Sequence, residues 1–186
     1  MRKMLLVAGL ALSLQGCFFA AGAAAGAAGA VAVYDHRKLE KIVKDQQITK
    51  QISGKISANH PLASDTHIEV TTFNQIVLLT GETSSAEQRQ QAEEIARSNP
   101  DVTKIYNELT IKGSTSALTR ASDSWITAKI KSIMLGTKDL QSGTIKVVTE
   151  NGTVYLMGIV NRSQADMAVD IARQVSGVQK VVKIFK

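Results

Sequence analysis

The sequence predicts an α+β protein with two tandem domains, each an αββαβ unit in which two helices pack on a three-stranded mixed sheet. Two observations carry this prediction. After residue 44 the chain contains two copies of one sequence pattern, offset by 76–78 residues. Both copies show the same order of helical and β-rich segments. A chain of 186 residues has room for two small domains. Aromatic residues make up only 4%, so each core must be aliphatic.

The two copies correspond residue by residue in several places. Residues 45–49 (DQQIT) match residues 123–127 (DSWIT) at an offset of 78. Residues 95–97 and 171–173 both read Ile-Ala-Arg, at an offset of 76. An offset that drifts by single residues is expected when loops differ in length and the regular elements do not. Two copies are too few for a solenoid, so they predict two separate domains.

Each copy contains two predicted helices. The first helix carries isoleucines spaced for one buried face, and these are Ile48, Ile52 and Ile56, then Ile126, Ile130 and Ile133. The second helix spans residues 85–98 in the first copy and 163–175 in the second. Each second helix opens at a serine, Ser85 or Ser163, whose hydroxyl can cap the first turn.

Each copy also contains three β-rich segments, two of which form a hairpin. In the second copy the hairpin strands are joined through Asn151-Gly152, a strong turn signal. A last strand closes each copy. The predicted strands are 68–72, 76–81 and 102–111, then 144–149, 153–159 and 178–185.

The N-terminus has the pattern of a bacterial export signal. Two basic residues precede an uncharged, leucine-rich run of 11 residues, 4–14, which is too short to cross a bilayer. The run ends in Leu14-Gln-Gly-Cys17, which resembles a lipobox, whose cysteine is lipidated after cleavage. We therefore expect a signal peptide at 1–16 and lipidation of Cys17. As Cys17 is the only cysteine, an intramolecular disulfide and a cysteine-based zinc site are both excluded.

Residues 17–44 are predicted to tether the domains to the membrane, because residues 18–33 form an uncharged Ala/Gly-rich run. The alternative is one uncleaved transmembrane helix through residues 4–33. Alanine and glycine contribute little insertion energy, which favours the lipid anchor. The residue after the cysteine is Phe18. In enteric lipoproteins an aspartate at this position usually marks retention in the inner membrane. Since this chain has no aspartate there, the resemblance implies the outer membrane.

The repeated unit resembles the BON domain. The resemblance rests on the αββαβ order and on two strand–glycine signatures, residues 77–81 (VLLTG) and 154–158 (VYLMG). A lipobox, an Ala/Gly tether and two such units are similar to dual-BON outer-membrane lipoproteins. The resemblance implies phospholipid binding through the second domain, support of envelope integrity, and a position facing the periplasm. The expected layout is BON domain 1 at 45–112, a linker at 113–120 and BON domain 2 at 121–186.

Charge is divided unequally between the two copies. The whole chain has a net charge of +6, but residues 34–113 hold 10 Lys and Arg against 11 Asp and Glu. Residues 114–186 hold 10 against 5. For an exported protein the natural target of a basic surface is anionic phospholipid, and nucleic acid is in the wrong compartment. A merely solvated, solubilising surface is the alternative on charge alone.

The first helix of the second copy presents a face that suits a membrane interface. At 100° per residue, Trp125 and Leu135 fall outside the predicted isoleucine stripe, and Lys129 and Lys131 flank them. An indole at head-group depth beside ammonium groups is typical of interfacial binding. The predicted phospholipid-binding residues are Ser124, Trp125, Ala128, Lys129, Lys131, Ser132 and Leu135. Subtracting 78 gives a polar face in the first copy, with Gln47 in place of Trp125. Packing of Trp125 against a neighbouring domain remains the alternative.

The sequence gives little support for catalysis. His36, His60 and His67 lack metal-ligand spacing, and no P-loop or nucleophile motif is present. We expect no enzyme activity, no cofactor and no metal site, and a monomer rather than an oligomer. The leading hypothesis is an anionic phospholipid membrane as partner. The alternatives are docking on an envelope protein, such as outer-membrane assembly machinery, or a BON stress protein without specific lipid binding.

Overall fold

The computed structural model describes residues 39–64 and 66–186, which belong to one compact unit, Arg37–Lys186. The predicted signal peptide at 1–16, the lipidated Cys17 and the tether up to residue 38 lie outside the described residues.

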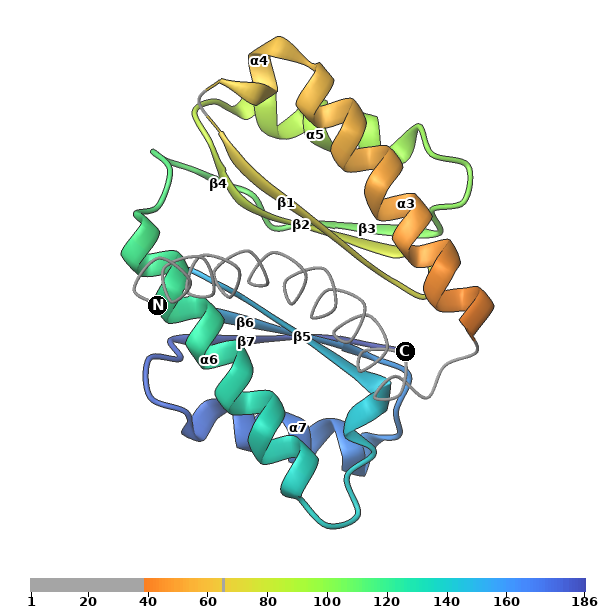
Figure 1. The fold of residues 1–186 in the computed structure, drawn as a ribbon, viewed down its shortest axis with the longest axis vertical. Helices are drawn as coiled ribbons and strands as arrows, with labels where there is room; N and C mark the ends of the chain where they lie inside the picture. The colour runs from red at the N-terminus through yellow and green to blue at the C-terminus, as the bar shows by residue number, and fades with distance from the viewer. Residues whose placement is uncertain (1–38, 65) are drawn as a thin grey trace, which may run out of the picture. The chain divides into compact units, whose positions relative to one another are not determined.

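The first domain has the predicted αββαβ order with one added short helix (Figure 1). Strand β2 is central, because it pairs antiparallel with β1 and parallel with β3 and β4. The elements are α3 (Leu39–Ala58), α4 (His60–Ala63), β1 (His67–Phe73), β2 (Ile76–Thr83), α5 (Ala86–Arg97), β3 (Lys104–Asn107) and β4 (Thr110–Ile111).

The second domain repeats this plan. Strand β6 is central, antiparallel to β5 and parallel to β7. The elements are α6 (Ala117–Gly136), the 3₁₀ turn η1 (Ser142–Thr144), β5 (Ile145–Glu150), β6 (Thr153–Gly158), α7 (Arg162–Gln174) and β7 (Lys180–Phe185). The two domains confirm the predicted α+β class and its tandem arrangement.

The boundaries of several elements differ from the prediction. Helices α3 and α6 begin earlier, so that α6 extends into residues predicted to form a linker. The last strand of the first domain is split into β3 and β4, because Leu109 turns into the core while its N–H bonds the side chain of Asn107. Helix α5 is capped by Ser85 as predicted. Helix α7 is instead capped by Asn161, whose Oδ1 accepts from the N–H of Gln164 at 2.9 Å.

Each domain buries an aliphatic core between its helices and its sheet. In the second domain α6 contributes Ile126, Ile130 and Met134, each at most 2% exposed. Ile133 is 37% exposed, so its predicted place in the core is wrong. Steps of four residues keep the side chains of α6 over the sheet, whereas the three-residue step to Ile133 turns its side chain toward solvent.

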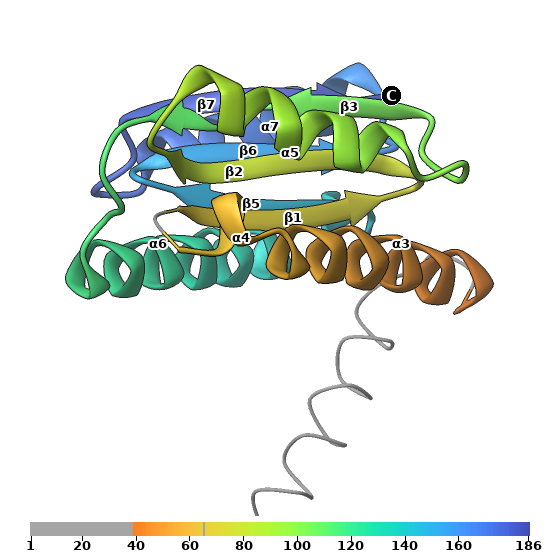
Figure 2. The ribbon, with the colours of Figure 1, turned by 90° about the horizontal axis from the view of Figure 1, so that it is seen from above.

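The faces of the two sheets that their own helices leave uncovered pack against each other. Figure 1 shows α3 and α5 on the outer side of one sheet and α6 and α7 on the outer side of the other. Figure 2 shows that α3 and α6 run along one side of the stacked sheets, and α5 and α7 along the other. The buried residues of this third cluster are Phe73, Ile76, Leu78, Val148, Tyr155, Met157 and Ile184. Both sheets are therefore covered on both faces.

The glycine that ends the first strand–glycine signature allows two strands to approach closely. Gly81 has φ +110°, and a Cβ added there would lie 1.9 Å from the backbone oxygen of His67 on β1. Any other residue would have to move the backbone of β1 or adopt a strained conformation. Gly54, near the C-terminal end of α3, is the opposite case, with nothing within 4 Å of an added Cβ.

We expect Gly81→Ala to lower the free energy of unfolding by at least about 2 kcal/mol, because it combines backbone strain with a clash. Gly54→Ala is the matched control and should raise it by about 0.5–1 kcal/mol, since alanine is the better helix former. Urea unfolding of both variants measures the two effects. A Gly81→Ala protein as stable as the wild type would contradict the assigned geometry.

Candidate functional site

Helix α6 is fixed to the second domain by its first turn and by one buried carboxylate. The hydroxyl of Ser116 accepts from the N–H of Thr119 and caps the helix. The two oxygens of Asp123 accept the backbone N–H groups of Asn151 and Gly152, at 2.7 and 2.9 Å. These two residues form the turn between β5 and β6 and have positive φ. Asp123 therefore joins α6 to the hairpin and sets which helix face points outward.

The same attachment recurs in the first domain. Asp45 accepts from the N–H groups of Asn74 and Gln75, at 2.7 and 2.8 Å. The hydroxyl of Thr49 donates to Thr72 at 2.8 Å, just as Thr127 donates to Thr149 at 2.7 Å in the second domain. The Asp and Thr that the two copies share thus have a structural role. Between them, Ile48 and Ile126 are shared and buried, whereas the exposed Gln46 and Gln47 of the first copy are replaced by Ser124 and Trp125 in the second.

The outward face of α6 carries all the residues predicted to bind phospholipid. Trp125 is 56% exposed and Leu135 is 65% exposed, large fractions for such apolar side chains. The structure therefore places the indole on the surface and not in a core. The remaining predicted residues are also exposed, and they are Ser124, Ala128, Lys129, Lys131 and Ser132.

The structure adds Leu118 to this face, a residue that the sequence analysis missed. Leu118 is 81% exposed and lies seven residues, nearly two helical turns, before Trp125. It was missed because the helix was expected to start near Asp123. Ser116 is the signal that could have found it, since a serine followed by helix-forming residues marks an N-cap. We define the α6 face as Leu118, Trp125, Ala128, Ser132 and Leu135, flanked by Lys129 and Lys131.

The positions of α3 that match the α6 face are polar, although Leu39 and Val43 elsewhere on this helix are exposed apolar residues. Gln47 takes the place of Trp125 and Glu40 that of Leu118, and both are exposed. Lys50 replaces Ala128 and Ser57 replaces Leu135. Since the two helices have the same length and the same attachment, the difference lies in the side chains alone. The chain thus offers its own internal control for any activity of the α6 face.

A second group of ionisable side chains lies between the two sheets. The carboxyl group of Glu150, at the end of β5, is buried. Burial is the main reason that its pKa is raised to about 7, and the nearby Glu82, Asp123 and Glu69 carboxylates raise it further. Glu82 is also buried, and its Oε1 lies 3.8 Å from Nζ of Lys112. Negative charge is therefore concentrated where the domains meet.

No helix in the described part of the chain is both long and apolar enough to cross a membrane. The fold and the α6 face together define a tandem α+β protein that presents an amphipathic surface on one of two otherwise equivalent domains.

The chain belongs to the BON domain family, which matches residues 44–113 and 122–186. It is 32% identical to the outer membrane lipoprotein DolP of Haemophilus influenzae over 186 residues, covering 100% of this chain and 96% of that protein. It is therefore a dual BON-domain, DolP-like protein, and the predicted resemblance is confirmed.

Two further relatives match about four fifths of this chain. The 21 kDa hemolysin of Actinobacillus pleuropneumoniae is 34% identical over 151 residues, 81% of this chain and 78% of its own length. The osmotically-inducible protein Y of Escherichia coli (strain K12) is 29% identical over 152 residues, 80% of this chain and 75% of its own length. None of the three relatives carries the name of an enzyme.

Proposed function

We propose that this protein is a lipid-anchored protein of the outer membrane, facing the periplasm, that binds anionic phospholipid through the α6 face and supports envelope integrity. The proposal rests on the α6 face, where Trp125 is exposed together with Leu118 and Leu135 and is flanked by lysines. The matching positions of the first copy lack this combination. The name of the relative from Haemophilus influenzae, an outer membrane lipoprotein, supports the location.

The proposed binding combines two physical terms. Partial transfer of Trp125 and the exposed leucines from water to the interface supplies the apolar term. Lys129 and Lys131 supply an electrostatic term of about 1 kcal/mol each near an anionic surface. The second copy as a whole, with its excess of basic residues, adds attraction at longer range. The first domain, which lacks these features, serves as a spacer or as a surface for another protein.

Vesicle composition and salt test this proposal. We expect the fragment of residues 37–186 to co-sediment with vesicles that contain phosphatidylglycerol and not with pure phosphatidylcholine vesicles. Raising the salt from about 0.05 M to about 0.5 M should release much of the bound protein, because it screens the lysine term. Binding that ignores head-group charge would contradict the proposal. No binding to any vesicle would favour the alternative, in which the α6 face docks on another envelope protein.

A further inference from the structure

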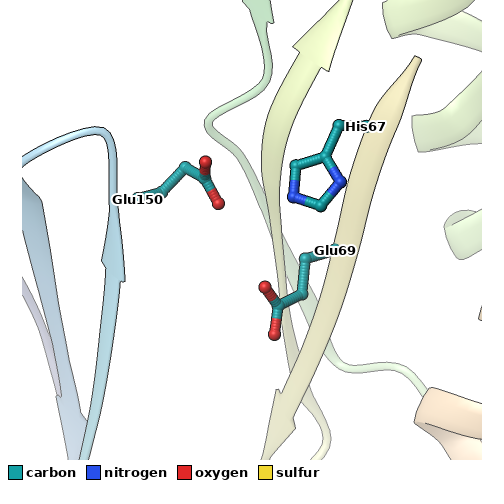
Figure 3. A group of neighbouring side chains, drawn as sticks. All are labelled: His67, Glu69 and Glu150. Carbon is teal, nitrogen blue, oxygen red and sulfur yellow. The ribbon is translucent and has the colours of Figure 1, made fainter. Parts of the chain in front are cut away.

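Three side chains from the two facing sheets meet at one end of the interface. His67 and Glu69 are two residues apart on β1 and therefore share a face of that strand. Glu150 is the last residue of β5 in the other domain. One ligand atom from each of the three residues lies within 4.8 Å of the other two. Figure 3 shows Glu150 facing the strand that carries His67 and Glu69.

In the described part of the chain, one oxygen of the buried Glu150 carboxylate has no hydrogen-bond partner, and the positive charge that acts on this carboxylate, Lys112, lies within ion-pair distance of Glu82. The residue is 8% exposed, and within residues 39–64 and 66–186 its Oε1 has no hydrogen-bond partner. Most buried carboxylates are paired with a cation or hydrogen-bonded at both oxygens, since an uncompensated buried charge is costly. The neighbouring carboxylates of Glu69 and Glu82 add to that cost. A cation placed among them would remove it.

We propose that His67, Glu69 and Glu150 bind a divalent transition-metal cation of the Zn²⁺ type, which links the two domains. An imidazole nitrogen with two carboxylate oxygens suits Zn²⁺, whereas Mg²⁺ and Ca²⁺ prefer oxygen ligands alone. In a tetrahedral site, bonds of about 2.0–2.2 Å place two ligand atoms about 3.3–3.6 Å apart, so the cluster must close by up to about 1.5 Å. Glu69, which is exposed, has the side-chain freedom to do so.

This site is separate from the α6 face, and its proposed role is different. Two of its ligands come from the first domain and one from the second, so a bound ion stabilises the packing of one sheet on the other. Three protein ligands leave one position of a tetrahedral Zn²⁺ ion for water. Sequence spacing gave no sign of the site, because the third ligand is supplied by the other copy.

Zinc titration of the full chain, purified in detergent and stripped with EDTA, tests the proposal. Competition with a chromogenic chelator gives the affinity, and thermal melts give the effect on stability. We expect Zn²⁺ to raise the melting temperature and Mg²⁺ to have little effect. His67→Asn and Glu150→Gln should each weaken Zn²⁺ binding by at least about tenfold. His60→Asn is the control, since His60 is an exposed histidine on α4, and should bind Zn²⁺ like the wild type.

The Glu150→Gln variant also distinguishes loss of Zn²⁺ binding from loss of folding. Because it removes a buried charge and keeps the shape of the side chain, it should melt no lower than the wild type in EDTA. If Zn²⁺ leaves the melting temperature of the wild type unchanged, the proposal is wrong. It is equally wrong if His67→Asn and Glu150→Gln bind Zn²⁺ as tightly as the wild type, because the ion then lies elsewhere.

Discussion

Replacement of Cys17 by alanine is expected to abolish membrane retention of the full-length protein while both domains stay folded. The described helices include none that could span a bilayer, and the α6 face alone supplies only reversible, salt-sensitive binding. The lipid on Cys17 is therefore the strong anchor in this account. Fractionation of cells after a high-salt wash measures the effect, and circular dichroism of the released protein checks the fold. A Cys17→Ala variant that stays with the membrane would favour a transmembrane helix at residues 4–33.

The second large effect is expected at the α6 face. Trp125→Ala should weaken vesicle binding by about tenfold, since partial burial of the indole contributes on the order of 1–2 kcal/mol. Adding Lys129→Gln and Lys131→Gln removes about 1 kcal/mol more for each lysine. The triple variant should therefore bind roughly a few hundredfold more weakly than the wild type at low salt. Co-sedimentation of the fragment of residues 37–186 over a range of lipid concentrations gives the three affinities.

Gln47→Ala is the matched control for Trp125→Ala, because Gln47 holds the equivalent position on α3. It should change neither binding nor stability. Trp125→Ala should also melt close to the wild type, since Trp125 is exposed and the core stripe is Ile126, Ile130 and Met134. If Trp125→Ala unfolds the domain, the tryptophan has a packing role that its exposure does not suggest. If it melts and binds normally, the α6 face has no part in membrane binding.

The repeat and the periodicity were enough to predict the domains and most of their elements. The hydrophobic pattern also placed Trp125 and Leu135 outside the core, because a helix has a single buried stripe. The same pattern failed at Ile133. A spacing of three and a spacing of four are both compatible with one helix face, and only the contact with the sheet decides between Ile133 and Met134.

The packing of one sheet on the other was not predicted, although the sequence carries a signal for it. Residues 76–79 and 154–157 are apolar at every position, which is the pattern of strands covered on both faces. Two helices on one face of each sheet account for the apolar character of only alternate residues in these strands, because successive side chains point to opposite faces. The roles of Asp45 and Asp123 in fixing the helices could not be predicted from a hydrophobic pattern. Their partners lie in hairpin turns, and each helix must be folded onto its sheet before the pairing is visible.

The cluster of His67, Glu69 and Glu150 lies beyond any local pattern. His67 and Glu69 share one strand of the first domain, but Glu150 belongs to the second, so the three side chains meet only because the two sheets are stacked. Tertiary structure was needed to find it, whereas the α6 face follows from one helix alone.

The fluorescence emission of Trp125 shows directly whether the α6 face enters the membrane. It is the single tryptophan of the chain, so intrinsic fluorescence reports on the α6 face without a label. Adding vesicles that contain phosphatidylglycerol to the fragment of residues 37–186 should shift the emission to shorter wavelength, and bromine on the lipid acyl chains should quench it. Salt should reverse both changes, and phosphatidylcholine vesicles should cause neither. An unchanged emission spectrum in protein that has co-sedimented with anionic vesicles would contradict the account, because the membrane would then be bound by another surface.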